Sequence, residues 1–186
     1  MPSNPAPGEL ELVRAFINTW DAEDDAESLP GPAALRDWLA ERDLLELGAR
    51  VTAADHQRAL ALREALRALL MANAGLDLDP RAGRTLDDAA RRARLGVRFD
   101  GHGHVHTAPE APGVDGALGR ILALVADAQE EGTWARLKAC LADDCQWAYY
   151  DLSRNRSAVW CDMASCGNRQ KVRSYRERHH PHALRN

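Results

Sequence analysis

Residues 140–169 read CLADDCQWAYYDLSRNRSAVWCDMASCGNR and contain all four cysteines of the chain. The cysteines form two pairs with the same C-x4-C spacing, and fifteen residues separate the pairs: Cys140, Cys145, Cys161 and Cys166. Two short-range pairs joined by a ribbon let four thiolates converge on one tetrahedral ion. The spacing therefore predicts a structural zinc site that holds one Zn²⁺.

Two other uses of four cysteines stay open, because the gap within each pair is wider than the usual two residues. Disulfides are the first. The opening residues Met1–Pro5 lack the basic and apolar regions of a secretory signal, which favours a cytoplasmic location, where disulfides seldom persist. An iron–sulfur cluster is the second alternative, since four cysteines can also ligate one.

The predicted site is structural rather than catalytic. A catalytic zinc ion usually keeps three protein ligands and one open position, whereas four thiolates close the coordination sphere. The sequence also contains no G-x-S-x-G, no G-x-x-x-x-G-K-[ST] and no complete G-x-G-x-x-G pattern, which are signatures of hydrolases, nucleotide-binding loops and dinucleotide-binding folds. We therefore expect no enzyme.

The sequence around the cysteines resembles the CGNR-type zinc finger found at the C-terminus of bacterial transcription regulators. The segments that carry the resemblance are 136–140, 144–147, 151–156, 160–163 and the tetrad 166–169, which is followed by 171–176. Residues 16–19, 35–39 and 95–100 resemble, in the expected order, the ABATE-type domain of stress-induced transcription regulators. The resemblance implies that the four cysteines are zinc ligands.

The resemblance and the composition together predict two parts. We expect an ABATE-like helical domain over residues 9–132 and a CGNR-type zinc module over residues 133–182. The fold class is mainly α (α+β), with a small β-hairpin in the first part and a ββα-like module in the second. No run of the 186 residues approaches the ~18 apolar residues that a membrane span requires, so a soluble protein without membrane contact is expected.

Periodicity and turn residues place the elements of the first part. Thr52 to Asp55 resembles a capping box that opens a long helix, and the segment from Asp79 to Gly83 is expected to break the helical pattern. The remaining expectations are helices over 10–20, after 30–32, around 85–94 and from about 118 to 131, and a hairpin over 97–107. His102, His104 and His106 lie in that hairpin, where solvent exposure is favoured over a second metal site.

Charge divides the chain unevenly. Residues 133–186 contain ten Lys and Arg against five Asp and Glu, whereas residues 1–132 contain fourteen against twenty-three. Asn168 is the expected N-cap of a basic helix that runs to His180. Guanidinium groups bind phosphate or guanine through two hydrogen bonds, so the candidate nucleic-acid contacts are the basic residues of the module: Arg154, Arg156, Arg169, Lys171, Arg173, Arg176 and Arg178.

These features predict a DNA-binding transcription regulator. The alternatives are a zinc-dependent protein-interaction adaptor, which pairs the basic module with acidic surfaces, and an RNA-binding protein that stacks bases on Trp147 or Tyr150. We expect Trp147, Tyr149, Tyr150 and Trp160 to form core around the metal instead. A homodimer and a small-molecule effector of the N-terminal domain remain open as further partners.

Overall fold

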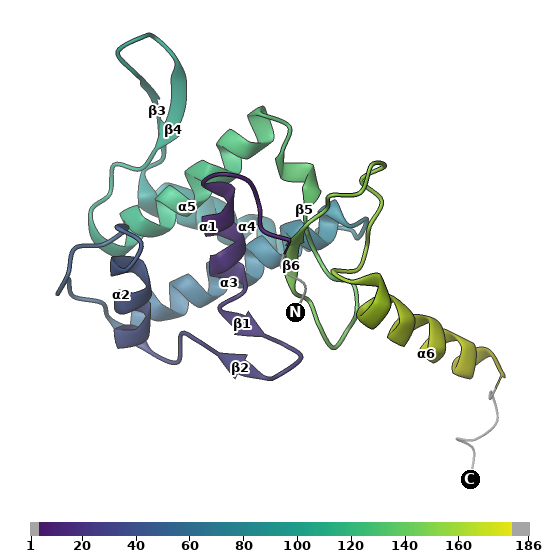
Figure 1. Cartoon of the computed structure of the whole chain (residues 1–186). Coiled ribbons are helices and arrows are strands. Elements are labelled where there is room, and N and C mark those ends of the chain that lie inside the picture. Colours follow the sequence, from purple (N-terminus) through teal and green to yellow (C-terminus); the bar gives the residue numbers. More distant parts are fainter. Residues whose placement is uncertain (1–3, 180–186) are drawn as a thin grey trace.

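The helices and strands confirm a mainly α protein with small antiparallel strand pairs (Figure 1). The computed structural model describes residues 4–179. A 3₁₀ turn, Trp134–Arg136, precedes β5, and a π-helical turn, Met163–Gly167, precedes α6. The elements are α1 Leu10–Ile17, β1 Trp20–Asp21, β2 Ala26–Glu27, α2 Pro32–Ala40, α3 Ala53–Asn73, α4 Pro80–Ala93, β3 Gly96–Phe99, β4 Val105–Ala108, α5 Gly113–Glu130, β5 Leu137–Ala139, β6 Ala148–Tyr150 and α6 Asn168–His179.

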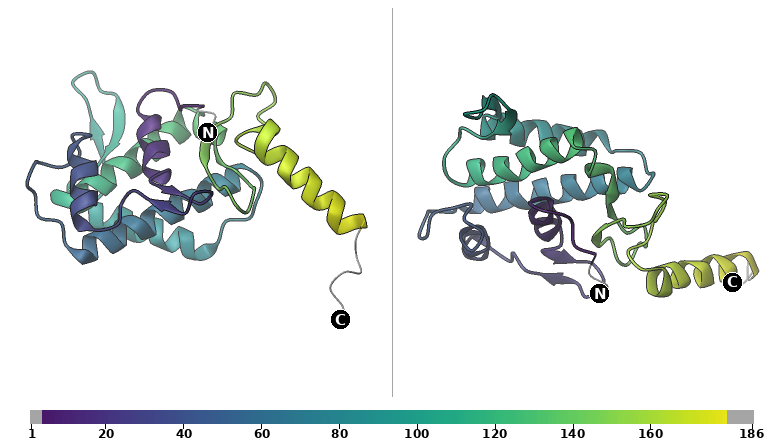
Figure 2. Two further views of the ribbon diagram at one scale, coloured as in Figure 1. Left: turned by 60° about the horizontal axis from the view of Figure 1, so that its bottom comes forward. Right: turned by 45° about the horizontal axis from the view of Figure 1, so that its top comes forward.

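The long helices α3, α4 and α5 run side by side, and the shorter α1 and α2 pack across them (Figure 2). Their apolar faces form one buried core that includes Phe16, Leu66 and Ile121. The strands form three separate antiparallel pairs, β1–β2, β3–β4 and β5–β6. Within the described residues, no helix has the length and apolar character needed to cross a membrane.

The start of α3 confirms the predicted capping box. The hydroxyl of Thr52 accepts a hydrogen bond from the backbone N–H of Asp55 at 3.2 Å, and the Asp55 carboxylate accepts one from the N–H of Thr52 at 2.7 Å. Two amide groups that the first helical turn leaves without backbone partners are satisfied in this way.

Two predicted boundaries are wrong. The segment from Asp79 to Gly83 begins a helix rather than breaking one. The carboxylate of Asp79 accepts a hydrogen bond from the N–H of Arg81 at 2.8 Å and so caps the helix. Pro80 lies in the first helical turn, where its missing N–H costs no hydrogen bond. The first helix ends at Ile17, and Trp20 belongs to β1 instead.

The zinc module shares its first strands with the helical core. Leu137, Ala139, Ala148 and Tyr150 of β5 and β6 are buried in the same cluster as α1, α3 and α5. The Asn18 side chain donates to the carbonyl of Ala148 at 2.9 Å and accepts from its N–H at 2.8 Å. Packing is therefore continuous across residue 132, and the division of the chain at that point stays a prediction about independent folding.

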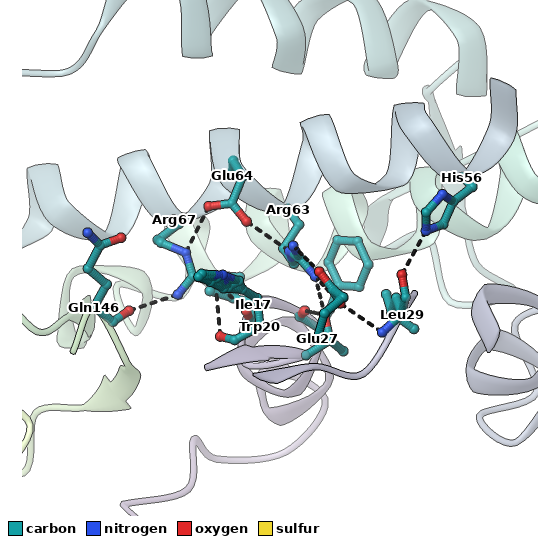
Figure 3. A network of polar contacts seen from close by, with 11 residues as sticks. Ile17, Trp20, Glu27, Leu29, His56, Arg63, Glu64, Arg67 and Gln146 are labelled. Atoms are coloured by element: carbon teal, nitrogen blue, oxygen red, sulfur yellow. Dashed lines mark hydrogen bonds and ion pairs between the residues drawn. The ribbon is translucent and has the colours of Figure 1, made fainter. Parts of the chain in front are cut away.

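Two buried arginines of α3 fix the segments that lie beneath it (Figure 3). Arg63 donates to both carboxylate oxygens of Glu27 at 2.8 Å, which ties β2 to the helix. Arg67 donates to the carbonyl of Ile17 at 2.7 Å and to the carbonyl of Gln146 at 2.8 Å. Because Gln146 directly follows Cys145, this helix also positions the first cysteine pair.

Candidate metal centre and nucleic-acid interface

The structure brings the four cysteines together from four segments. Cys140 follows β5, Cys145 ends the turn after it, Cys161 follows the loop 151–160, and Cys166 lies in the π-helical turn. All four are buried, and their Sγ atoms lie within 4.8 Å of one another. Among the described residues this is the one group of His, Cys, Asp and Glu ligand atoms close enough to hold a metal.

The spacing of the sulfur atoms fits a tetrahedral zinc ion. With a Zn–S distance of about 2.3 Å, the sulfurs of a tetrahedral site lie about 3.8 Å apart. The Sγ atoms of Cys145 and Cys161, and those of Cys161 and Cys166, are 3.6 Å apart. Sulfurs at this separation are not joined as disulfides, whose S–S bond is about 2.05 Å. The module can hold one structural zinc ion.

The thiols need a cation in order to ionise together. Hydrogen bonds from the thiols of Cys145 and Cys161 lower the pKa of Cys140. The hydrogen bond with Cys140 raises the pKa of Cys145. The pKa of Cys161 is raised by its hydrogen bonds with Cys140 and Cys145. One thiolate thus suppresses ionisation of its neighbours. A bound dication reverses this effect, because it stabilises every thiolate that ligates it.

Local backbone contacts shape both pairs of ligands. In the first pair, the N–H of Cys140 donates to the carbonyl of Trp147 at 2.9 Å, which closes the turn. In the second pair, the Asp162 carboxylate accepts from the N–H of Ala164 at 3.0 Å and from the hydroxyl of Ser165 at 2.9 Å. The N-terminal cap of this helical segment is therefore Asp162. The prediction that Asn168 is the N-cap is wrong, since Asn168 already has helical backbone angles.

A buried ion pair holds the loop between the cysteine pairs. The Lys138 ammonium, on β5, donates to the Asp151 carboxylate at 2.9 Å and to the carbonyls of Arg156 and Ala158 at 2.6 and 3.0 Å. The side chains of Lys138 and Asp151 are 4% and 1% exposed. Both residues lie in segments that carry the CGNR resemblance, 136–140 and 151–156. Their pairing was not predicted, because one lysine and one aspartate thirteen positions apart carry no local signal.

Two of the predicted nucleic-acid contacts are paired within the chain. Arg169 forms an ion pair with Glu23 of the β1–β2 turn, and its Nη2 donates to Cys166 Sγ at 3.2 Å. Arg173 pairs with Asp143 at 3.2 Å. The carboxylates hold α6 against the first cysteine turn and against the N-terminal part of the chain, so these two arginines fix the orientation of the helix.

Four of the predicted contacts point to solvent. Arg154 and Arg156 lie in the loop after β6, and Lys171 and Arg176 lie on α6; all four are exposed, and none forms an ion pair with another described residue. The side chain of Arg178 lies outside the described residues. Helix α6 projects away from the body of the protein (Figures 1 and 2), which leaves Lys171 and Arg176 accessible to a partner.

The aromatic residues around the metal site form core. Tyr149 and Tyr150 are buried, and the Tyr149 hydroxyl donates to the carbonyl of Ala158 at 2.9 Å. Trp147 and Trp160 are half-buried against the cysteine cluster. The predicted core role around the metal is confirmed for Trp147, Tyr149 and Trp160. Tyr150 is buried in the helical core instead, so its ring is not open to a stacked base.

The histidines of the β3–β4 hairpin are separate from this centre. His102 and His104 are exposed, with ring centroids 6.2 Å apart, and the His104 ring nitrogen lies 3.1 Å from the Asp100 carboxylate. Three such side chains do not gather their ring nitrogens in the described structure.

A four-cysteine site in a small ββα module that packs on a helical body defines a zinc-finger protein. Residues 136–179 match the CGNR zinc finger. Residues 10–142 match the ABATE domain, described as "Putative stress-induced transcription regulator", and the chain belongs to this family. Neither is an enzyme family. No curated protein matches the chain.

Proposed function

We propose that this protein regulates transcription by binding duplex DNA through its zinc-organised basic module. The observation that carries the proposal is a set of exposed cations, two on the loop 151–158 and two on α6, that form no ion pair with another described residue: Arg154, Arg156, Lys171 and Arg176. Cations held on a rigid frame release counterions from the phosphate backbone without paying the full entropy of ordering.

The shape of the module suits a duplex. The major groove of B-DNA is about 12 Å wide and admits one α-helix, and α6 projects from the body of the protein (Figure 2). We place α6 at the groove, with Arg154 and Arg156 of the loop 151–158 on the flanking phosphates. Phosphate contacts of this kind set the register of the helix, and contacts to base edges supply specificity.

The zinc ion supplies structure to this arrangement. Bound by Cys140, Cys145, Cys161 and Cys166, it fixes the start of α6 relative to the loop that carries Arg154 and Arg156. The chain's own ion pairs, Arg173 with Asp143 and Lys138 with Asp151, hold the same two segments. An RNA-binding role that stacks bases on Tyr150 is weakened, because Tyr150 is buried, whereas Trp147 is half-buried. We assign the protein to the cytoplasm and expect no catalytic activity.

Alanine substitution of these four exposed cations tests the proposal. Binding to duplex DNA should be weaker in each of four variants: Arg154→Ala, Arg156→Ala, Lys171→Ala and Arg176→Ala. Where the removed side chain contacts only phosphate, the loss should be the same for all DNA sequences, and the slope of log affinity against log salt should become smaller in magnitude by about one. Fluorescence anisotropy with mixed genomic duplexes measures both effects.

The matched control is Arg92→Ala, which removes an exposed arginine of the helical body and should leave DNA affinity unchanged. The proposal fails if the zinc-loaded protein binds no duplex at low salt, or if the module variants bind as tightly as the control. Binding to an acidic protein surface in place of DNA would then favour the adaptor role.

A further inference from the structure

One guanidinium connects the metal site to the N-terminal part of the chain. Arg169 donates from Nη2 to Cys166 Sγ at 3.2 Å, donates from Nη1 to the Glu23 carboxylate, and places Nε 3.7 Å from the Asp144 carboxylate. These partners come from the second cysteine pair, the β1–β2 turn and the first cysteine pair. Arg169 therefore contacts three segments that are far apart in the sequence.

The contact with sulfur has a consequence for metal binding. Four thiolates around one Zn²⁺ leave a net charge of about −2, and a cation that donates to one of the sulfurs offsets part of it. Groups that hydrogen-bond to metal ligands orient those ligands and tune the metal, and their removal typically lowers metal affinity by about 10–100-fold. The planar guanidinium can serve a sulfur and a carboxylate at once, which an ammonium cannot do with fixed geometry.

The carboxylate partner is itself held in place. The N–H of Glu23 donates to the Asp21 side chain at 2.9 Å, which closes the β1–β2 turn. The same hairpin is tied to α3 through the two hydrogen bonds between Arg63 and Glu27 (Figure 3). Glu23 thus presents its carboxylate to Arg169 from a turn whose hairpin is anchored to α3 by Arg63.

We propose that Arg169 is a positioning residue of the zinc centre, which holds the Cys166 thiolate and is in turn held by Glu23. Zinc affinity then depends on the β1–β2 hairpin of the N-terminal part, and zinc occupancy fixes how α6 sits against that hairpin. The inference concerns metal binding and does not rest on DNA binding.

Zinc affinity of the full chain, measured by competition with a chromophoric chelator, tests the inference. Arg169→Gln should lower the affinity about 10–100-fold, and Arg169→Lys should lower it less, because the charge stays while the fork is lost. Glu23→Gln should lower the zinc affinity by about 10-fold, the lower end of the range expected for Arg169→Gln. The double variant should equal Arg169→Gln, because Glu23 acts through Arg169.

Two matched controls separate this role from general charge effects. Asp24→Asn removes a neighbouring carboxylate of the same turn, and Arg92→Gln removes an exposed arginine of α4. Both should retain native zinc affinity. In the cobalt-substituted protein, the sulfur-to-metal charge-transfer bands should shift in Arg169→Gln and Arg169→Lys and stay in place in Arg92→Gln.

Native zinc affinity in Arg169→Gln overturns the inference. If the fold-losses in zinc affinity of Glu23→Gln and Arg169→Gln multiply in the double variant, the two residues act independently, because independent effects add in free energy. That result would overturn the proposal that Glu23 acts through Arg169. If Arg169→Gln does not fold, Arg169→Lys carries the test, and unchanged zinc affinity with unchanged cobalt bands in that variant contradicts the proposal.

Discussion

At the scale of single residues, the cysteines and the arginines differ in how much the sequence reveals. The four ligands were predictable because a C-x4-C pair is local: each turn brings its own two thiols together. The partners of the arginines were not. Arg169 and Arg176 are the same residue type on one helix, and only the folded chain distinguishes them, by placing Glu23 beside Arg169.

The buried pair of Lys138 and Asp151 gives a prediction at this scale. Lys138→Met leaves the Asp151 charge buried without its cation, so we expect a loss of about 3–5 kcal/mol of unfolding free energy. Adding Asp151→Asn should recover part of that loss, because the uncompensated charge is then removed. Denaturant unfolding of the zinc-loaded protein measures both, and a Lys138→Met variant as stable as the native protein would contradict the role of the pair.

The same pair sets a dependence on pH. Burial alone would raise the pKa of Asp151, but hydrogen bonds from Ser153 and Lys138 outweigh it and lower the pKa below its ordinary value of 3.8. A lowered carboxyl pKa stabilises the fold above pH 3.8, and this stability is lost as the pH falls through the folded pKa. In Asp151→Asn, the free energy of unfolding should therefore depend less on pH in the acid range.

At the scale of elements, helix interiors followed from the sequence better than helix ends. The capping box at Thr52 is a local pattern of side chain and backbone, and it was predicted correctly. The segment with Pro80 was expected to break the helical pattern, yet it starts a helix. Proline is common both just after a helix and in its first turn, and here the Asp79 side chain caps the helix that begins at Pro80. The π-helical turn before α6, which carries Cys166, was not predicted from the sequence.

Two glycines in neighbouring helices give opposite predictions. A Cβ at Gly83 of α4 would meet nothing within 4 Å, so Gly83→Ala should stabilise the protein by about 0.5–1 kcal/mol through helix propensity. A Cβ at Gly119 of α5 would lie 2.5 Å from the Ala93 side chain and 2.8 Å from that of Pro109. Gly119→Ala should destabilise by about 1–3 kcal/mol through overpacking.

Thermal or denaturant unfolding of the two variants checks this pair of predictions. The glycine substitutions are chemically identical, so a difference in sign isolates the close approach of α4 and α5. Equal stabilisation by both would show that the helices do not pack as closely at Gly119 as the structure has them.

At the scale of the whole molecule, the sequence predicted two parts, and the structure joins them more closely than composition suggests. The charge difference between residues 1–132 and 133–186 is clear in the sequence, but the burial of Leu137 and Tyr150 under the helical core is not. Strands of three residues carry too little pattern to reveal which face another element covers. The metal module is thus built onto the helical body, and α6 is the part that leaves it.

The most direct test of the central claim is the salt dependence of duplex DNA binding by the full chain, loaded with zinc and then chelated. The slope of log affinity against log salt is about −0.9 for each phosphate neutralised, so the four exposed cations predict a slope of about −3 to −4. This binding should disappear when the metal is removed. No binding at low salt with zinc in place, or an affinity and slope that chelation leaves unchanged, would contradict a zinc-organised DNA-binding module.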